Sequence, residues 1–567
     1  MKHLTHHVDF CVVGGGMAGT IAAIAAARKG IRTALIQDRP VLGGNASSEI
    51  RMHICGAHGS NNRETGILEE MILENCYRNP EANFSIWDSV LYEKARQEPN
   101  LLLFLNCTCQ RAETKQNRIL SVTGWQMTSE TYHTVYAAYF ADCSGDSILA
   151  PLTGAAYRIG REAREEFGES IALEQADTRT MGMSCLLQFR ETTHPSPYIP
   201  PAWSYTFPTD EDLPKTVHGI GDNFWWIELG GEQDSIHDTE AIKDELLKIA
   251  FGVADHLKNQ QDHGMECWQL DWVGFLPGKR ESRRYEGDVI ITQRDVEQAG
   301  KHFPDIVAYG GWTMDNHFPG GFYYRDTHPT VYNQAPSPWG IPFRALYSKN
   351  MDNLLFAGRN ISATHVAMSS SRVMATCAVV GQAVGTAVAQ CVKTNTTPRT
   401  LNLSLLQQTL MEDDCYLPFL HRSISPATKQ ARCTHPVVTN GYDRPLENED
   451  NGAMLSPGES IVFTWPQPQQ LSQLRLIFDS DLNRAEKNMP AYHPLDWGDK
   501  YKTPKTLVKS FRVILFHPQG TKTEFTVENN YQRMVRIPLD ADAIKTEITP
   551  LSTWGAEKFH IFSVDFQ

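Results

Sequence analysis

A glycine pattern near the start of the chain has the spacing of a phosphate-binding turn. Residues 9–19 read DFCVVGGGMAG, so Gly14, Gly16 and Gly19 directly follow a short apolar run. In such a turn the first glycine permits the reversal from strand to helix, and the second lets the backbone approach a pyrophosphate. The third lets helix and strand pack closely, and the free N–H groups of the helix start favour a phosphate. The pattern predicts a dinucleotide site.

The segments around this turn predict an α/β fold. Residues 10–13 have the length and β-branched content of a buried parallel strand, 20–29 form an alanine-rich helix, and 31–37 form a second strand. In dinucleotide folds an acid at the end of the second strand bonds the ribose hydroxyls. Here Gln37 holds that place and Asp38 follows it, so the ribose contact is open between these two side chains.

The rest of the chain suggests a discontinuous arrangement. Helices are expected over 61–77 and 85–97, and strands over 101–107, 118–127, 131–139 and 137–145. The helix–strand alternation is then lost from about 151 to 350, where the many aromatic residues more often fill a core than line a pocket. Residues 353–358 return to a buried-strand pattern, and 365–393 have the small residues of a tightly packed helix. The nucleotide-binding part is therefore expected to be completed by a late segment.

Composition excludes several classes of protein. The net charge of −14, without a compensating basic run, argues against nucleic acid as a partner. The sequence contains no stretch of about 18 uninterrupted apolar residues, so no membrane span is expected. The N-terminus lacks the apolar region of a secretory leader, so no leader is expected either. The 12 cysteines show no paired spacing typical of a metal centre, so no metal site is expected. Reduced thiols and a cytoplasmic location fit best.

Five blocks, in order along the chain, resemble the FAD-dependent oxidoreductase family. They read GGGMAG, RPVLGGNASSEIR, FADCSGD, LPGKRESRR and NLLFAGRNISATHVAMSSSRVMATCAVVGQAVGTA. The resemblance covers about residues 9–395 and implies a fold similar to glutathione-reductase-type flavoproteins, with FAD as the cofactor. The tail after about residue 433, with short β-rich runs at 459–465, 474–478, 511–517, 523–527 and 534–538, predicts an all-β sandwich. This tail resembles a galactose-binding-like jelly roll.

The fold class expected is α/β, with a Rossmann-like FAD-binding domain, an inserted α+β substrate domain and a C-terminal all-β sandwich. The expected boundaries are 1–160 for the first part of the FAD-binding domain, 161–350 for the inserted substrate or cap region, 351–395 for the return segment, 396–432 for a helical connector and 433–567 for the sandwich.

By position, the resemblance implies a set of cofactor-binding residues. They are Gly14, Gly16, Gly19, Gln37, Asp38, Arg39, Gly43, Gly44, Asn45, Asp142, Gly145, Gly358, Arg359 and Arg372. The first three would hold the pyrophosphate, 37–39 would lie beside the adenosine ribose, and 43–45 would run along the cofactor. Asp142 and Gly145 would close the nucleotide side, and Gly358 and Arg359 would meet the ribityl–pyrophosphate portion. A helix starting near residue 371 would direct its positive end at the flavin pyrimidine ring.

Oxidation of a substrate by a flavin often needs a base for the leaving proton, and histidine titrates near neutrality. The candidates are His53, His58, His317 and His365. His365 and His53 are preferred, because each directly follows a predicted cofactor loop. Arg280 and Arg283, in the basic run 279–284, are candidates for orienting a polar or charged group of the substrate. Cys55 has no paired partner in sequence and is interpreted as a packing thiol.

The function predicted is oxidation of a small polar substrate, with a carbohydrate or sugar-derived alcohol as first choice, by hydride transfer to flavin N5. The substrate suggestion depends on the aromatic residues of the insert and on the jelly-roll resemblance of the tail. Two alternatives stay open: a carbohydrate-binding protein with a structural flavoprotein-like scaffold, and an NAD-dependent dehydrogenase. The electron acceptor is unknown, and a homo-oligomer is left open.

Overall fold

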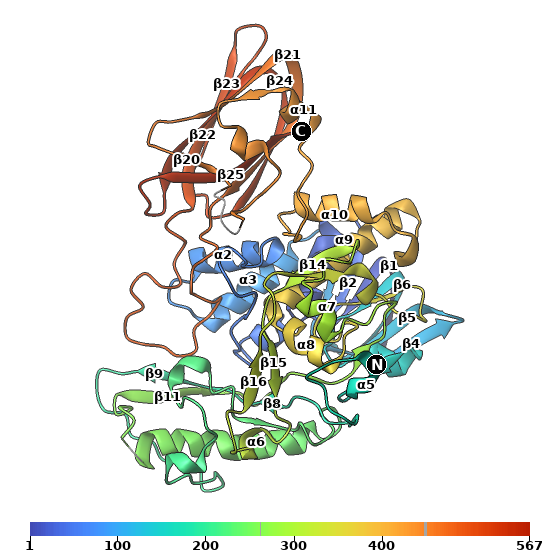
Figure 1. The fold of residues 1–567 in the computed structure, drawn as a ribbon, viewed down its shortest axis with the longest axis vertical. Coiled ribbons are helices and arrows are strands. Elements are labelled where there is room, and N and C mark those ends of the chain that lie inside the picture. Colours follow the sequence, from blue (N-terminus) through green and yellow to red (C-terminus); the bar gives the residue numbers. More distant parts are fainter. Residues whose placement is uncertain (261, 447–450) are drawn as a thin grey trace. The chain divides into compact units, whose positions relative to one another are not determined.

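The computed structural model describes residues 1–260, 262–446 and 451–567 (Figure 1). Its contacts divide the chain into two compact units. Unit 1 contains residues 1–58, 81–406 and 487–500, and unit 2 contains residues 59–80, 407–486 and 501–567. Each unit is therefore assembled from segments that lie far apart in the sequence.

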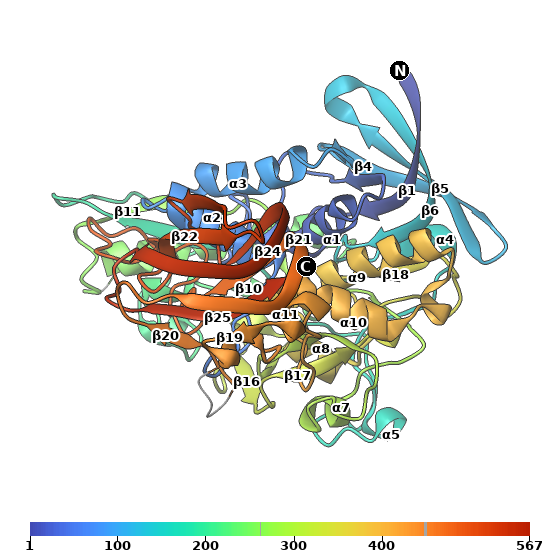
Figure 2. The same ribbon diagram turned by 90° about the horizontal axis from the view of Figure 1, so that it is seen from above.

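Unit 1 is built around a seven-stranded mixed sheet, whose order is β3-β2-β1-β6-β5-β4 with β18 paired to β6. Figure 2 shows β1, β6, β5 and β4 lying together in this sheet. The bounds are β1 (Lys2–Val13), β2 (Thr33–Ile36), β3 (Leu101–Phe104), β4 (Cys107–Lys115), β5 (Arg118–Gln126), β6 (Thr131–Asp142) and β18 (Leu354–Phe356). Strands β3, β2, β1, β6 and β18 run parallel, whereas β4 and β5 continue the sheet antiparallel. Leu354 pairs with Phe140, so the late return to the sheet is confirmed.

Two helices pack closely on this sheet, α1 (Met17–Arg28) and α9 (Met374–Thr394). A Cβ added at Gly381 would overlap the carbonyl oxygen of Ala18, and one at Gly385 would overlap that of Ala22. The glycines thus allow the two backbones to touch. Helix α9 is long and apolar enough to cross a membrane by length and composition alone, but 94% of its apolar window is buried inside the protein. Such burial is typical of a helix in the core of a protein.

The segment 365–393 forms two helices rather than one. Helix α8 (His365–Ser371) ends before Val373, whose extended backbone caps α9 at φ −66° and ψ 147°. The break matters because it creates a second helix N-terminus within the same stretch. Likewise, the strands expected over 131–139 and 137–145 are one continuous strand, β6, which ends at Asp142.

Between β6 and β18 the chain forms small sheets and short helices. Their bounds are α4 (Leu149–Thr153), β7 (Tyr157–Arg158), α5 (Arg164–Phe167), β8 (Met183–Ser184), β9 (Leu187–Glu191), β10 (Glu228–Leu229), α6 (Thr239–Asp255), β11 (Trp268–Val273), β12 (Gly278–Lys279), β13 (Arg284–Tyr285), α7 (Gln293–Glu297), β14 (Ile306–Gly310), β15 (Met314–His317), β16 (Thr330–Asn333) and β17 (Trp339–Pro342). The 17-residue α6 was not expected; its apolar face, including Ile242, Leu246 and Ile249, packs into a core that contains the fully buried Trp226.

Unit 2 contains a seven-stranded antiparallel sheet of order β20-β25-β21-β24-β22-β23, with β19 paired to β21. Its elements are α2 (Ile67–Arg78), α11 (Pro426–Gln430), β19 (Arg432–Cys433), β20 (Ala453–Leu455), β21 (Ile461–Phe478), β22 (Val508–Phe516), β23 (Lys522–Val527), β24 (Met534–Thr553) and β25 (Phe559–Phe566). Phe463, Leu474 and Phe511 belong to its apolar core. The antiparallel β character of the tail is confirmed.

Two element boundaries in this part differ from the sequence expectation for local reasons. The runs 459–465 and 474–478 belong to the single strand β21, whose register against β24 shifts between Thr464 and Gln469 and again between Leu471 and Gln473. Such shifts let one long strand bend without ending. Helix α2 begins at Ile67 rather than at 61, because Gly66 precedes it with φ +76°, outside the helical region. Helix α10 (Leu403–Glu412) lies within the expected connector.

A candidate cofactor and substrate cavity

A cavity of about 850 Å³ lies in unit 1 where β1, β2, β6 and β18 end. Ligands of open α/β sheets bind at this edge, outside the carboxyl ends of the strands, and the volume is that of a ligand site. The predicted cofactor residues that line it are Gly14, Gly16, Gln37, Asp38, Arg39, Gly43, Gly44, Asn45, Gly145, Gly358, Arg359 and Arg372. Gly19 and Asp142 are absent from the lining.

The glycine turn leaves its open side towards this cavity. Gly14 has φ +102°, and a Cβ there would lie 2.5 Å from backbone atoms of Cys143. A Cβ at Gly19 would overlap the carbonyl oxygen of Gly14, so Gly19 serves helix–strand packing instead of lining the cavity. At Gly16, by contrast, an added Cβ would meet only the Cα of Gly44, at 3.9 Å. Gly16 and Gly44 thus lie close against each other, and because neither has a side chain their backbones stay uncovered where they line the cavity.

Two helix N-termini open onto the same cavity. Helix α1 begins after Gly16 and α9 after Val373; neither has a side-chain cap or an acid in its first turn. Gly16, Met17, Val373 and Met374 all line the cavity. Uncapped helix starts carry partial positive charge. The start of α1 therefore suits a pyrophosphate, and the start of α9 suits an electron-rich ring. The residues present therefore fit FAD, which carries both groups.

Gln37 holds the glycine turn in place. Its Oε1 accepts a hydrogen bond from the N–H of Gly15 at 2.7 Å, and its Nε2 donates to the carbonyl oxygen of Val41 at 3.2 Å. Both polar atoms of this buried side chain are thus engaged within the chain. Asp38 also lines the cavity and keeps its side chain 59% exposed, which leaves its carboxylate accessible for a ribose contact.

Asp142 orders the turn after β6 from below the cavity. Its Oδ1 accepts from the N–H and hydroxyl of Ser144, at 2.9 and 2.7 Å, and its Oδ2 accepts from the N–H of Leu149 and the hydroxyl of Tyr285, both at 2.7 Å. Burial raises the pKa of the Asp142 carboxyl. Both of its oxygens are thus engaged within the chain, where they support the turn that contains Gly145.

Asp146, which the sequence analysis did not single out, lines the cavity instead. Its Oδ1 accepts from Arg359 at 2.6 Å and from the Ser282 hydroxyl at 2.8 Å, and its Oδ2 accepts from Lys279 at 2.8 Å. Burial alone would raise the pKa of Asp146, but Arg359 and Lys279 hold it well below its usual range. The sequence signal that could have identified Asp146 was its place at the end of the FADCSGD block.

The histidine candidates separate clearly. His53 lines the cavity, and burial, aided by Lys487, lowers the pKa of His53 to about 4, so its ring is neutral at pH 7. His365 is buried outside the lining, with Nδ1 at 2.9 Å from Glu281 Oε2 and Nε2 at 2.8 Å from Asn316 Oδ1. The structure therefore brings one of the two preferred histidines to the cavity, and the other supports the protein interior.

His317 and two arginines line one region of the cavity, where they are paired with two carboxylates. His317 Nδ1 lies 2.6 Å from Glu228 Oε2, and its Nε2 lies 3.4 Å from Asp315 Oδ2. Arg372 Nη2 lies 3.1 Å from Asp315 Oδ2, and Arg280 Nη1 lies 3.5 Å from Glu228 Oε2. Although burial raises the pKa of Asp315, His317 and Arg372 hold it well below its usual range. Two carboxylates thus face two guanidinium groups and the His317 ring.

Arg283 and His58 lie outside this lining. Arg283 donates to the carbonyl oxygen of Asp146 at 3.3 Å and stands 5.6 Å from the centre of the Tyr157 ring. His58 is exposed and stacks on Trp312, with ring centres 4.3 Å apart. Cys55 does line the cavity. The aromatic residues of the lining are Trp225, Trp312 and Tyr332.

This fold and this cavity define a dinucleotide-binding protein of the α/β class. Residues 9–410 match the sequence profile of the family described as FAD dependent oxidoreductase, and the chain belongs to that family. It is an FAD-dependent oxidoreductase, and FAD is its cofactor. No curated protein matches the chain.

Several solved structures match parts of the chain at low sequence identity. A geranylgeranyl bacteriochlorophyll reductase-like protein from Thermoplasma acidophilum is 12% identical, over 73% of this chain and 85% of that one, with a TM-score of 0.32. Sdh1 of Mycobacterium smegmatis, solved with UQ1, is 12% identical over 73% of each chain, with a TM-score of 0.28. A family 32 carbohydrate-binding module of EndoD from Streptococcus pneumoniae is 12% identical over 24% of this chain and 92% of that one, with a TM-score of 0.18.

Proposed function

We propose that this oxidoreductase oxidises an alcohol group of a small, uncharged, hydroxylated substrate, with carbohydrates and sugar-derived alcohols as the class. The observation that carries the proposal is the pairing of the two arginines beside the cavity. Arg280 and Arg372 each have a buried carboxylate as partner, so neither guanidinium group is free to bind a strongly anionic substrate as its sole counter-ion. Hydrogen-bonding groups next to Trp225 and Trp312 suit a molecule with hydroxyl groups and apolar C–H faces.

In this proposal FAD lies as in glutathione-reductase-type folds. The start of α1 would hold its pyrophosphate, Asp38 would contact its ribose, and the start of α9 would face its pyrimidine ring. When bound, FAD supplies the group that accepts the substrate hydride. Arg372 is placed to orient an oxygen of the cofactor or the substrate, since its buried Nε has no hydrogen-bond partner among the residues that the structure describes.

His53 is proposed as the residue that accepts the hydroxyl proton of the substrate. Its ring is neutral at pH 7 and lines the cavity, so a ring nitrogen can take up the proton that leaves when the alcohol becomes a carbonyl. His317 is already engaged by two carboxylates and is proposed to position Arg280 and Arg372 through them. General-base assistance of this kind contributes about 10²–10⁴-fold in rate.

An anaerobic substrate panel tests the substrate class. FAD-loaded protein is mixed with sugars, polyols, hydroxy acids and amines, and the loss of oxidised-flavin absorbance is recorded. We expect reduction by members of the first two groups. Reduction by amines or hydroxy acids alone would contradict the proposal. If nothing reduces the flavin while the isolated chain still binds sugars, the carbohydrate-binding alternative is favoured instead.

The rate of flavin reduction should depend on pH through His53. Because burial lowers the pKa of His53 to about 4 from 6.5, the rate should rise with pH through that region and level off above about pH 6. The same shift means that the unfolded chain binds more protons between these values, so stability decreases as the pH falls from 6.5 towards 4. His53→Asn should remove the acidic limb of the rate profile. A limb centred near 6.5 that persists in this variant would contradict the assignment.

The fold of the tail, the domain boundaries and the location are proposed as well. The antiparallel sheet of unit 2 and its apolar core support a galactose-binding-like jelly roll. The proposed domain boundaries are residue 160 at the end of the first cofactor-binding part, 350 at the end of the insert, 395 at the end of the return segment and 432 at the end of the connector. A cytoplasmic location is proposed from the cysteine pattern. The electron acceptor and a homo-oligomeric state are left for experiment.

A further inference from the structure

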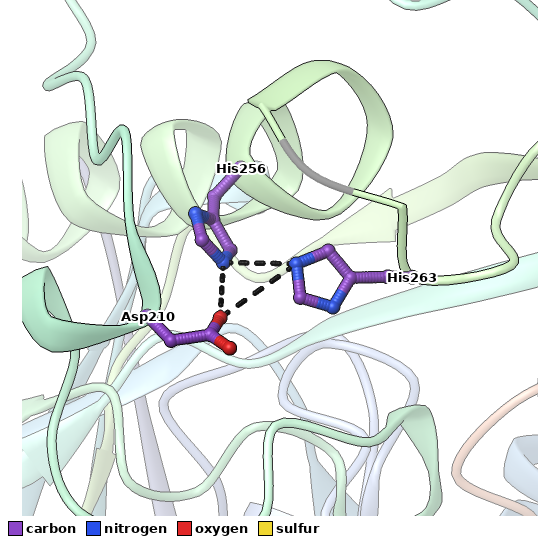
Figure 3. Close-up of side chains that lie close together, drawn as sticks. All are labelled: Asp210, His256 and His263. Carbon is purple, nitrogen blue, oxygen red and sulfur yellow. Dashed lines mark hydrogen bonds and ion pairs between the residues drawn. The ribbon is translucent and has the colours of Figure 1, made fainter.

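A cluster of metal-ligating side chains lies in unit 1, and none of them lines the cofactor cavity (Figure 3). His256 Nε2 lies 2.9 Å from Asp210 Oδ1 and 3.0 Å from His263 Nε2, and His263 Nε2 lies 3.7 Å from the same Asp210 oxygen. We propose that these three residues bind a divalent transition metal ion, with Zn²⁺ as the best match.

Three separate segments bring the ligand atoms together. His256 follows α6 and starts the π-helical turn η5 (His256–Gln260), and its side chain is fully buried. Asp210 starts the 3₁₀ turn η3 (Asp210–Asp212), which a reciprocal capping box between Thr209 and Asp212 holds in place. His263 comes from the loop after η5. Figure 3 shows both rings directed at the Asp210 carboxylate. A π-helical turn inside or next to an α-helix is frequent at functional sites.

The hydrogen bonds of His256 indicate which of its ring nitrogens carries a proton. Its Nδ1 lies 2.7 Å from the carbonyl oxygen of Phe207, and a carbonyl can only accept, so Nδ1 is the donor. In the neutral ring Nε2 then has a lone pair, and this lone pair faces the carboxylate oxygen of Asp210. Either a proton on Nε2 or a cation must lie between these two atoms, and a metal ion there would be coordinated by both. Metal-ligating histidines usually donate their other N–H in this manner.

His218 repeats the arrangement from the same loop as Asp210. Its Nε2 lies 2.8 Å from the carbonyl oxygen of Pro214, which makes Nε2 the donor, and its Nδ1 faces Asp210 Oδ1 at 3.9 Å. Thus two histidines are each anchored by a backbone carbonyl and aim their other nitrogen at one carboxylate oxygen. His218 is the candidate fourth ligand.

The distances and donor types suit zinc. Zn–N and Zn–O distances of about 2.0–2.1 Å in tetrahedral geometry place ligand atoms about 3.3 Å apart, and the three measured separations of 2.9, 3.0 and 3.7 Å bracket this value. Imidazole nitrogens with one carboxylate favour Zn²⁺ over Mg²⁺ or Ca²⁺. A cavity of about 500 Å³ lined by Asp210, His218 and His263 gives the ion and a water ligand a path from solvent.

The site has a consequence for the larger cavity. Thr216, Val217 and Asp222, which line that cavity, belong to the same segment as Asp210 and His218. A metal ion would tie this segment to the end of α6 and so fix the part of the lining that it provides. This consequence rests on the proposed function, whereas the binding of the metal does not.

Metal binding is tested on the full chain without a histidine tag. Protein treated with a chelator and then dialysed is titrated with Zn²⁺ against a chromophoric competitor, with Mg²⁺ as a parallel titration. We expect one strong Zn²⁺ site, no Mg²⁺ binding, and a Zn²⁺-dependent rise of the Tm, because the ion binds only the folded chain. His263→Gln and Asp210→Asn should weaken Zn²⁺ binding at least about a hundredfold, as loss of a ligand exceeds the 10–100-fold effect of its supporting contacts.

Two matched variants control for other histidines. His237 pairs with the exposed Asp234 at 2.8 Å, and His133 Nδ1 lies 3.0 Å from His6 Nε2; His237→Gln and His133→Gln should both keep the strong site. The proposal is overturned if the unsubstituted protein binds Zn²⁺ no more tightly than His263→Gln does. That result would mean that the three side chains only form hydrogen bonds with one another. Loss of the strong site in either control would overturn it as well. None of these readouts depends on flavin reduction.

Discussion

A Gly16→Val protein is expected to fold but to lose FAD. The backbone at Gly16 has φ −65° and ψ −178°, an extended conformation that any residue adopts, and an added Cβ meets only Gly44 Cα at 3.9 Å. The backbone therefore accepts a β-carbon here, whereas the two methyl groups of valine would extend over the backbone that the pyrophosphate must approach. We expect FAD affinity to fall at least about a hundredfold, which is about 2.8 kcal/mol. Flavin fluorescence on titration measures it.

The control for this prediction is Gly30→Ala. Gly30 has φ +81° and lies in open space, so the alanine costs roughly 1 kcal/mol of stability through its backbone conformation alone. Loss of a good N-cap residue should cost Gly16→Val a similar amount. The two variants should therefore have similar Tm values but differ in flavin content. If both retain FAD, the pyrophosphate does not lie at the start of α1.

Substitution of His53 is expected to slow flavin reduction without releasing the cofactor. His53→Asn removes the neutral ring nitrogen that is proposed to accept the substrate proton, so reduction by an active substrate should slow by about 10²–10⁴-fold at pH 7. FAD affinity should change by less than about threefold, since no phosphate or ribose contact is assigned to His53. Stopped-flow absorbance under anaerobic conditions measures the rate.

His58→Asn is the matched control, five residues further along the same segment. His58 itself lies outside the cavity lining, although it stacks on the lining residue Trp312. Its replacement removes no group assigned to proton transfer and should leave the reduction rate within about threefold. Equal rates for the unsubstituted protein and His53→Asn would exclude His53 as the base. Equal slowing in both variants would point instead to a change in the whole segment.

The cofactor side of the cavity was predictable because its signals are local. The spacing of Gly14, Gly16 and Gly19 fixes a turn within six residues, and the same short-range logic identifies the glycine pair at 43–44. The return of β18 to the sheet was predicted from a buried-strand pattern and is confirmed. Position along a motif does not, however, fix where a side chain points. Asp142 and Asp146 share one block, and only the second lines the cavity.

The catalytic side was less predictable because it depends on contacts between distant segments. His365 was chosen for the loop that precedes it, but Glu281 and Asn316 hold its ring away from the cavity. The Asp210, His256 and His263 cluster was missed for the same reason. Its members are far apart in sequence or separated by a π-helical turn, so no metal-ligand spacing appears. The prediction of no metal site is therefore replaced by a proposal of one.

The most direct test of the account is a titration of cofactor-free protein with FAD and, separately, with NAD. The glycine turn alone fits either nucleotide, whereas the late strand β18, the paired glycines and the uncapped start of α9 fit the longer flavin cofactor. We predict saturation at one FAD per chain, with shifted flavin absorbance, and no competition by NAD. Binding of NAD with no flavin signal at any FAD concentration would contradict the account.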